Sequence, residues 1–220
     1  MVFEMTIFGI FPKAKTMSFK KLIEPLKDNL KHKGFESPLP FQKTILPKIK
    51  SGASLFCIAP KDSGKTTSII LSVVQKLKGE AFEDAPRALI FVKDKETALH
   101  LKSEFESYTR RTDLRIYCAY EEHNIELQRE ELYLGTDIVI ATPKRLNRIF
   151  FLNGINLNKL QMCIVEDAEF LFRNNNLAEV TRTPESIGKC QYLVFSTEYD
   201  PRFERWRETF MDNAQVVKVK

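Results

Sequence analysis

The chain has 220 residues, enough for one α/β domain with a single hydrophobic core. Its composition, 43% hydrophobic and 29% charged, is that of an ordinary globular protein, and no apolar run approaches the length needed to span a membrane. The net charge of +5 is compatible with an anionic partner such as nucleic acid, but a solvated surface can have the same balance, so charge alone does not assign a function.

The cysteines and the N-terminus bear on the cellular compartment. The four cysteines are widely separated, form no C-x-x-C pair and lie mostly in or beside apolar runs: Cys57, Cys118, Cys163 and Cys190. They are typical of reduced core residues rather than of disulfides or zinc ligands. Residues 1–11 are apolar, but they include Glu4 and lack a basic start, so no secretory signal is expected. We predict a cytoplasmic protein without a membrane anchor.

The first third of the chain contains two predicted helices and a strand. Residues 1–17 lack periodicity and are expected to form an N-terminal extension. A helix is predicted from Ser18 to Gly34, and a second one begins at Pro38-Leu39-Pro40 and ends at Gly52. The apolar run 55–59 then predicts a buried strand, and apolar residues at helical spacing follow from Lys65 onward.

Strands and helices alternate through the rest of the chain. Further strands are predicted at 87–92, 114–119, 137–141, 162–165, 192–196 and 216–219, with helices at 97–108, 125–134, from 143, and 201–211. This alternation is typical of parallel βαβ units. We therefore predict one α/β domain over residues 18–220, a mostly parallel open sheet of about seven strands with helices on both faces. Ligands of such sheets bind beyond the carboxyl ends of the strands.

The segment between the strand at 55–59 and the following helix has the pattern of a phosphate-binding loop. It reads Ala59-Pro-Lys-Asp-Ser-Gly-Lys-Thr66. In such a loop the backbone N–H groups and the helix N-terminus surround a polyphosphate, while a lysine neutralises its charge and a hydroxyl binds Mg²⁺. Lys65 and Thr66 stand at those two positions. The pattern could also arise by chance in a lysine-rich chain, but its place between a buried strand and an amphipathic helix favours the functional interpretation.

The order of several segments resembles that of the DEAD-box RNA helicases. Residues 34–42 are similar to the Q motif, 59–66 to motif I, 92–98 to the P-T-R-E-L-A segment, 135–146 to the T-P-G-R-L region, 164–169 to the D-E-A-D sequence and 195–198 to F-S-A-T. The resemblance covers about residues 18–220 and implies a RecA-like P-loop fold, the first of two such domains. The second domain, which in the family supplies half of the RNA track and an arginine finger, has no counterpart in these motifs. Met1 and the N-terminal segment favour a complete short protein.

The resemblance implies an ATP site with Mg²⁺. It places Gln42 on the adenine edge and Phe35 on its face, although a surface glutamine and a core phenylalanine would fit the same pattern. The remaining nucleotide-binding residues would be Ser63, Gly64, Lys65, Thr66 and Thr67. Asp62 replaces a family glycine, and its carboxylate would face the phosphates. We therefore expect ATP binding about 10- to 100-fold weaker than with glycine there.

The acidic turn departs from the family in the lengths of its side chains. Glu166 stands where the family has the Asp that binds Mg²⁺, and Asp167 stands where it has the Glu that orients the attacking water. With Lys65, these are the candidate catalytic residues, and Thr66 and Glu166 are the candidate metal ligands. Because shifts near 1 Å can reduce a rate ~100-fold, metal binding is expected to outlast hydrolysis. An acidic loop without chemistry is the alternative.

The resemblance also implies contacts to an RNA backbone. Lys95, Thr142, Lys144 and Arg145 are the candidate RNA-binding residues, with an ordinary solvated surface as the alternative. Asp94 occupies a family threonine position, and the family's Gly-Gly turn is replaced near Tyr120-Glu121. Both changes bring negative charge toward a phosphate track, so we expect weak, salt-sensitive RNA binding.

Three hypotheses follow. The leading one is a helicase-like domain that binds ATP–Mg²⁺ and RNA, hydrolyses ATP weakly or not at all, and does not unwind RNA alone. The second is one half of an active ATP-dependent RNA helicase that needs a second RecA-like domain. The third is a catalytically inactive scaffold that binds a protein partner.

Overall fold

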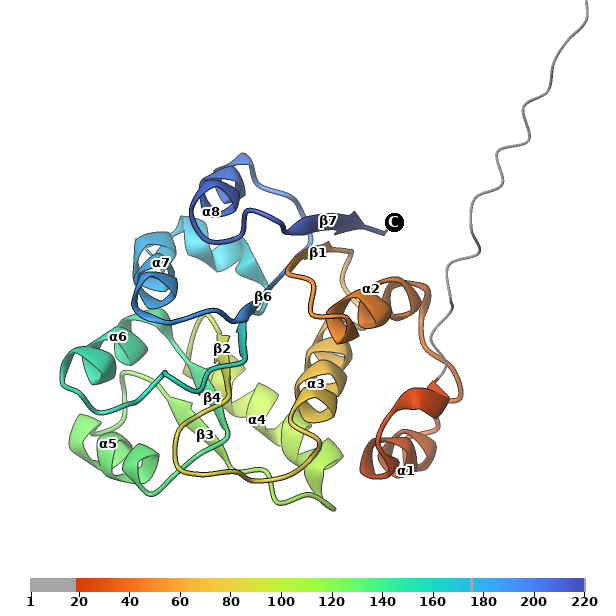
Figure 1. Cartoon of the computed structure of the whole chain (residues 1–220), viewed down its shortest axis with the longest axis horizontal. Helices are drawn as coiled ribbons and strands as arrows, with labels where there is room; N and C mark the ends of the chain where they lie inside the picture. Colours follow the sequence, from red (N-terminus) through yellow and green to blue (C-terminus); the bar gives the residue numbers. More distant parts are fainter. Residues whose placement is uncertain (1–18, 175, 220) are drawn as a thin grey trace, which may run out of the picture.

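A seven-stranded sheet organises the structure, a computed structural model that describes residues 19–174 and 176–219 (Figure 1). All its strand pairs are parallel, in the order β3-β4-β2-β5-β6-β1-β7. The strands are β1 (Leu55–Ile58), β2 (Ala88–Phe91), β3 (Ile116–Ala119), β4 (Ile138–Ala141), β5 (Met162–Val165), β6 (Gln191–Ser196) and β7 (Gln215–Lys218). The predicted parallel sheet is confirmed. The predicted N-terminal extension, residues 1–17, and the predicted N-cap Ser18 lie outside the described residues.

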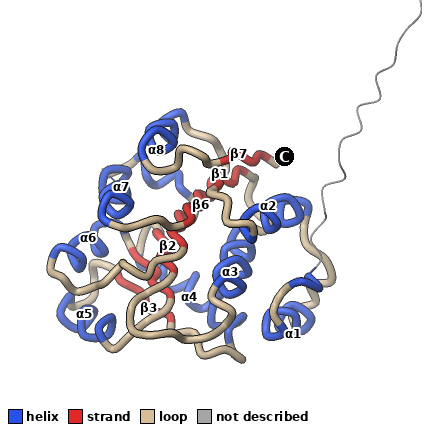
Figure 2. The backbone as a smooth tube through the Cα atoms, in the orientation of Figure 1, coloured by secondary structure: helices blue, strands red, loops and turns tan. Residues whose placement is uncertain are grey.

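Helices cover both faces of the sheet (Figure 2). They are α1 (Glu24–His32), α2 (Pro40–Lys50), α3 (Lys65–Lys76), α4 (Lys95–Thr109), α5 (Ile125–Tyr133), α6 (Pro143–Phe151), α7 (Asn176–Ser186) and α8 (Glu204–Thr209), with 3-10 turns η1 (Phe19–Lys21), η2 (Ala168–Phe172) and η3 (Pro201–Phe203). α1 to α4 pack on one face in one core cluster, and α5 to α8 pack on the other face in a second cluster.

Burial explains why the strands are nearly continuous apolar runs. Every residue of β1, β2, β4, β5 and β6 is buried, because each of these strands has a helical layer on both sides. The edge strand β7 is mostly exposed. Three of the four cysteines are buried in strands, and all four are free thiols.

Three helical predictions need correction. The first helix begins at Glu24 rather than at Ser18, because Pro25 fits only in a first turn, and a separate 3-10 turn precedes it. α7 was not predicted, because its internal Pro184 and its polar side chains weaken the helical pattern. The helix predicted at 201–211 is divided into η3 and the shorter α8.

The carboxyl ends of the parallel strands form one edge of the sheet, and the candidate site residues follow these ends. The phosphate-loop residues lie between β1 and the first turn of α3, and the acidic turn follows β5. The predicted RNA-binding residues follow β2, where Lys95 begins α4, and β4, where Thr142 precedes α6. Within the described part of the chain, no helix is long and apolar enough to cross a lipid bilayer.

Candidate functional site

The loop between β1 and α3 joins a buried strand to a helix through a left-handed glycine. It leaves the sheet at Ile58 and ends at Gly64, which precedes the first residue of α3 and has φ +88°. A Cβ on Gly64 would lie 2.6 Å from Gln42 Nε2, so glycine is needed both for the left-handed backbone and for the close approach of the Gln42 amide. Asp62 also has positive φ, +61°, and is exposed. Its backbone therefore adopts a conformation that glycine adopts at lower energy.

Lys65 and Thr66, the first residues of α3, face the acidic turn after β5. The buried Lys65 ammonium donates to the carbonyl of Ala59 at 3.3 Å and lies 3.4 Å from Asp167 Oδ1. The Thr66 hydroxyl donates to Glu166 Oε1 at 3.0 Å. These four side chains, predicted as a group, are thus brought together across the sheet from two loops about 100 residues apart in the chain.

Glu166 is a buried carboxylate, and one of its two oxygens accepts no hydrogen bond. Its side chain is only 6% exposed, and Oε2 is buried without a hydrogen-bond partner. Burial raises the pKa of Glu166 to about 7, and the neighbouring Asp167 adds to this, whereas Thr66 and Lys65 act in the opposite direction. A carboxylate and a hydroxyl beside a free oxygen are ligands that suit Mg²⁺, which binds through one or two carboxylates and substrate phosphates. The residues present therefore fit a magnesium ion.

Of the two predicted Q-motif residues, Gln42 contacts the loop directly. Gln42 is buried, accepts a hydrogen bond from the Leu39 N–H at 2.9 Å and donates to the Gly64 carbonyl at 3.4 Å. Phe35 is 47% exposed and follows Gly34, which ends the first helix with φ +74°. Its ring is therefore accessible to a stacked group.

The two remaining loop predictions occupy different surroundings. The Ser63 hydroxyl donates to the Pro60 carbonyl at 2.8 Å and closes the loop on itself. Thr67 hydrogen-bonds with the buried Tyr108 of α4. Burial raises the pKa of Tyr108, and the hydrogen bond with Thr67 offsets part of that increase. The Thr67 hydroxyl thus has a protein partner.

A hydroxyl that sequence reasoning missed replaces one that the family has. Glu169 Oε1 accepts hydrogen bonds from the Ser196 hydroxyl at 3.1 Å and from both the backbone N–H and the hydroxyl of Thr197 at 2.5 Å. The family threonine is Glu198 here, but Thr197 supplies a hydroxyl one residue earlier. Three hydrogen bonds to Glu169 therefore join the acidic turn to the loop after β6. In the sequence, only the threonine next to Glu198 could have indicated this contact.

Two of the predicted RNA-binding residues, Thr142 and Arg145, hydrogen-bond with Glu121. The Thr142 hydroxyl donates to the Glu121 carboxylate, and the Arg145 guanidinium donates to the Glu121 carbonyl. Thr142 and Arg145 are both buried, and Arg145 Nε has no hydrogen-bond partner. The Glu121 carboxylate thus occupies the Thr142 hydroxyl, and the main chain at the same residue occupies Arg145.

The other two predicted RNA-binding residues, Lys95 and Lys144, are more exposed to solvent. The Lys95 ammonium lies 5.5 Å from the centroid of the Tyr120 ring, and Lys144 is exposed at the start of α6. Asp94 caps α4 by accepting hydrogen bonds from the Thr97 N–H at 2.9 Å and the Thr97 hydroxyl at 2.6 Å. Its carboxylate, expected to repel a phosphate track, is therefore largely engaged with the protein.

Together, a glycine-ended loop, an adjacent lysine and threonine, and an opposing acidic turn at the carboxyl edge of a parallel sheet define a RecA-like P-loop domain. The chain belongs to the DEAD/DEAH box helicase family, because the sequence profile described as DEAD/DEAH box helicase matches residues 39–201.

Curated relatives and solved structures agree with this assignment. The chain is 26% identical over 192 residues to the pre-mRNA-processing ATP-dependent RNA helicase PRP5 of Meyerozyma guilliermondii, covering 84% of this chain and 22% of that protein. It is 26% identical over 227 residues to DEAD-box ATP-dependent RNA helicase 52A of Oryza sativa, covering 94% of this chain and 38% of that protein. The chain thus spans well under half the length of these relatives.

Solved structures resemble this chain more in fold than in sequence. The crystal structure of a DEAD box protein from Methanococcus jannaschii superposes with a TM-score of 0.84 at 22% identity, covering 93% of this chain and 56% of that one. The yeast DEAD-box splicing factor Prp28 gives 0.82 at 18% identity, covering 94% and 52%. At these identities, the likeness establishes the shared RecA-like fold.

Proposed function

We propose that this domain binds ATP with Mg²⁺ at the loop after β1 and binds RNA weakly beside it. The observation that carries the proposal is the convergence of Lys65, Thr66 and Glu166, with one oxygen of the buried carboxylate left without a partner. An unsatisfied buried acceptor beside a glycine-ended helix N-terminus is suited to a hydrated cation and the anion that it accompanies. Residues 18–220 are proposed to act as this single domain.

The residues of this chain have separate tasks in that site. The N–H groups at the start of α3 hold the phosphates, and Lys65 exchanges the Ala59 carbonyl and Asp167 for a phosphate oxygen. Thr66 and Glu166 would hold Mg²⁺, which neutralises phosphate charge when bound. Gln42 reads the adenine edge with its amide, Phe35 stacks on the base, and Ser63 and Thr67 shape the loop.

Hydrolysis by the isolated domain is proposed to be slow or absent. Asp167 is one methylene shorter than the family glutamate that orients water, and its side chain is 64% exposed. A water held by a solvated, shorter carboxylate is poorly positioned, which can reduce the rate ~100-fold. An arginine finger from another domain contributes ~10³–10⁵ in related sites, so a single domain lacks that acceleration as well.

RNA binding is proposed to be weak because Glu121 competes with the phosphate backbone. Thr142 must leave the Glu121 carboxylate, and Arg145 the Glu121 carbonyl, before they can donate to RNA, whereas Lys144 is already exposed and Lys95 is partly exposed beside Tyr120. Unwinding is not proposed for this domain alone, since one domain provides one wall of the cleft.

Thermal unfolding tests the nucleotide site. We expect saturating ATP–Mg²⁺, at ~100 times its dissociation constant, to stabilise the chain by about 2.7 kcal/mol and to raise Tm by roughly 5–10 °C. Lys65→Ala should abolish the shift, whereas Lys61→Ala, which changes an exposed lysine of the same loop, should retain it. Identical melting of the parent chain with ATP–Mg²⁺, with ADP and in buffer would favour the protein-binding scaffold instead.

A second candidate function is half of an ATP-dependent RNA helicase, and the short coverage of the relatives favours it: the chain spans 22% of one helicase and 38% of another. In that case, mixing the chain with a second RecA-like domain should produce an RNA-stimulated ATPase that neither part has alone. The cytoplasmic location predicted from the sequence stays a prediction, and cell fractionation can check it.

A further inference from the structure

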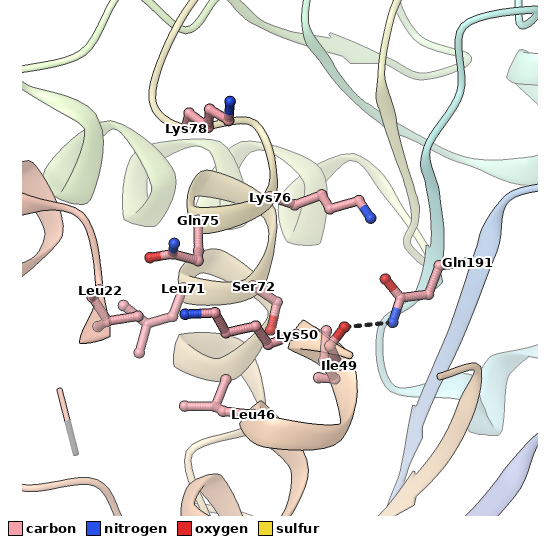
Figure 3. Close-up of a pocket in the computed structure, with 10 residues that line it drawn as sticks. All are labelled: Leu22, Leu46, Ile49, Lys50, Leu71, Ser72, Gln75, Lys76, Lys78 and Gln191. Carbon is pink, nitrogen blue, oxygen red and sulfur yellow. Dashed lines mark hydrogen bonds between the residues drawn. The ribbon is translucent and has the colours of Figure 1, made fainter. Parts of the chain in front are cut away.

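A cavity unrelated to the nucleotide site lies at the opposite end of α3. It has a volume of about 200 Å³ and lies between the second half of α3, the end of α2, the start of β6 and Leu22 (Figure 3). Lys65 is at the first turn of α3 and Ser72 is seven residues further, about 10 Å along the axis at 1.5 Å per residue. The cavity therefore belongs to the amino-end side of the sheet, away from the family motifs.

The base of the cavity is apolar, but two of its polar side chains are incompletely bonded. Leu22, Leu46, Ile49 and Leu71 form the apolar wall. Ser72 is 7% exposed and its hydroxyl has no partner, and Gln191 is 6% exposed with Oε1 unpaired. The Gln191 amide nitrogen is fixed by the carbonyls of Ile49 at 2.9 Å and Ala53 at 2.7 Å, so the orientation of the free oxygen is fixed too. Native proteins rarely leave such atoms unpaired.

The charge at the cavity has one sign. Lys50, Lys76 and Lys78 line it, and no acidic residue does. Lys50 donates to the Lys21 carbonyl at 3.4 Å. In Figure 3, Lys76 extends from α3 toward the side on which Gln191 lies. An anionic group at this rim would meet a positive potential.

We propose that this cavity binds a small aromatic acid that carries an N–H donor. Its ring would fill the apolar base, and its carboxylate would lie among the lysines. Ser72 Oγ and Gln191 Oε1 each have less than 1 Å² of accessible surface, so the ligand N–H would donate to the Ser72 oxygen after the Ser72 side chain rotates toward the cavity. The volume suits such a molecule, because an apolar cavity of ~150 Å³ accepts benzene and this one is larger and has polar atoms in its wall. The three chemical requirements come from three separate features of the wall.

Titration of the ¹⁵N-labelled full chain with indole-3-acetate tests the proposal. We expect a dissociation constant on the order of 1 mM, typical of a ligand of this size, with amide shifts at Leu71, Ser72 and Gln191 and none at Gly64 and Lys65. Naphthalene-1-acetate, which lacks the N–H, and indole, which lacks the carboxylate, should each bind at least threefold more weakly.

Two variants and a control complete the experiment. The double change Lys76→Gln and Lys78→Gln should weaken indole-3-acetate binding at least threefold and leave indole unchanged, and Lys31→Gln, an exposed lysine on α1, should change neither. Ser72→Leu, which fills the cavity, should abolish binding. Equal affinities for the three compounds, or shifts only at the nucleotide loop, would overturn the proposal. So would binding that occurs only after residues 1–17 are deleted, since this chain's own N-terminal segment would then be the occupant.

Discussion

Replacing Asp62 by glycine should tighten ATP binding about 10- to 100-fold. Asp62 is an exposed carboxylate in a loop whose other groups are arranged for an anion. Two unit charges ~4 Å apart repel by about 1 kcal/mol in water and about 4 kcal/mol at an effective dielectric near 20. An exposed side chain at the mouth of a site lies between these limits. Removing 1.4–2.7 kcal/mol of repulsion corresponds to the stated range.

The same substitution should leave folding almost unchanged. With φ +61°, Asp62 has a left-handed backbone that costs an ordinary residue roughly 1–2 kcal/mol and glycine nothing. Glycine, however, increases the conformational entropy of the unfolded chain by a comparable amount. We therefore expect the free energy of unfolding to change by less than about 1 kcal/mol, so that any change in affinity reports on the site itself.

The assay is a titration with a fluorescent ATP analogue in the presence of Mg²⁺, at low and high salt. Asp62→Asn is the matched control, because it removes the charge and asparagine tolerates the left-handed region. If repulsion dominates, both variants bind more tightly, and their advantage shrinks as salt screens the charges. Affinities equal to that of the parent chain for both variants would refute the electrostatic argument.

Three further outcomes follow from the structure. Glu121→Gly should free the Thr142 hydroxyl and remove a carboxylate beside it, whereas Arg145 keeps the main-chain carbonyl of residue 121 as its partner. Affinity for single-stranded RNA should therefore rise in a fluorescence anisotropy titration; unchanged binding would mean that Thr142 does not contact RNA. Thr197→Val should lower the free energy of unfolding by about 1–3 kcal/mol, because Glu169 loses a hydroxyl donor; chemical denaturation measures this, and Thr197→Ser should restore stability. Asp137→Asn should lower it by about 3–5 kcal/mol, because Asp137 is fully buried between Arg87 at 2.6 Å and Arg115 at 2.9 Å. Burial acts to raise the pKa of Asp137, but hydrogen bonds from both arginines and from the Phe82 N–H hold it below its ordinary value. Its stabilising effect is therefore complete above the unfolded pKa of about 3.9 and is lost as pH falls through the lower folded pKa. The difference in urea unfolding between the two proteins should therefore begin to shrink below about pH 4 and disappear only below the folded pKa of Asp137.

The sheet and the nucleotide loop could be predicted because their signals are local. Seven short apolar runs separated by helical patterns require a parallel sheet covered on both faces, and the spacing from Ala59 to Thr66 places a lysine and a hydroxyl at a helix start. The start of α1 and the existence of α7 were harder, because proline within or near a helix obscures the periodicity that predicts it.

Only the tertiary structure decided which hydrogen-bond partners the site side chains have. The sequence placed carboxylates at Glu166 and Glu121, but nothing local indicates that one keeps a buried oxygen unpaired whereas the other accepts a hydrogen bond from Thr142. Likewise, Thr197 is adjacent to a lost threonine in the chain, yet its role depends on Glu169, 28 residues away. Composition and periodicity determine which elements form, since burial and backbone geometry act over a few residues. Hydrogen-bond partners depend on which loops the sheet brings together at its carboxyl edge, and that requires the folded chain.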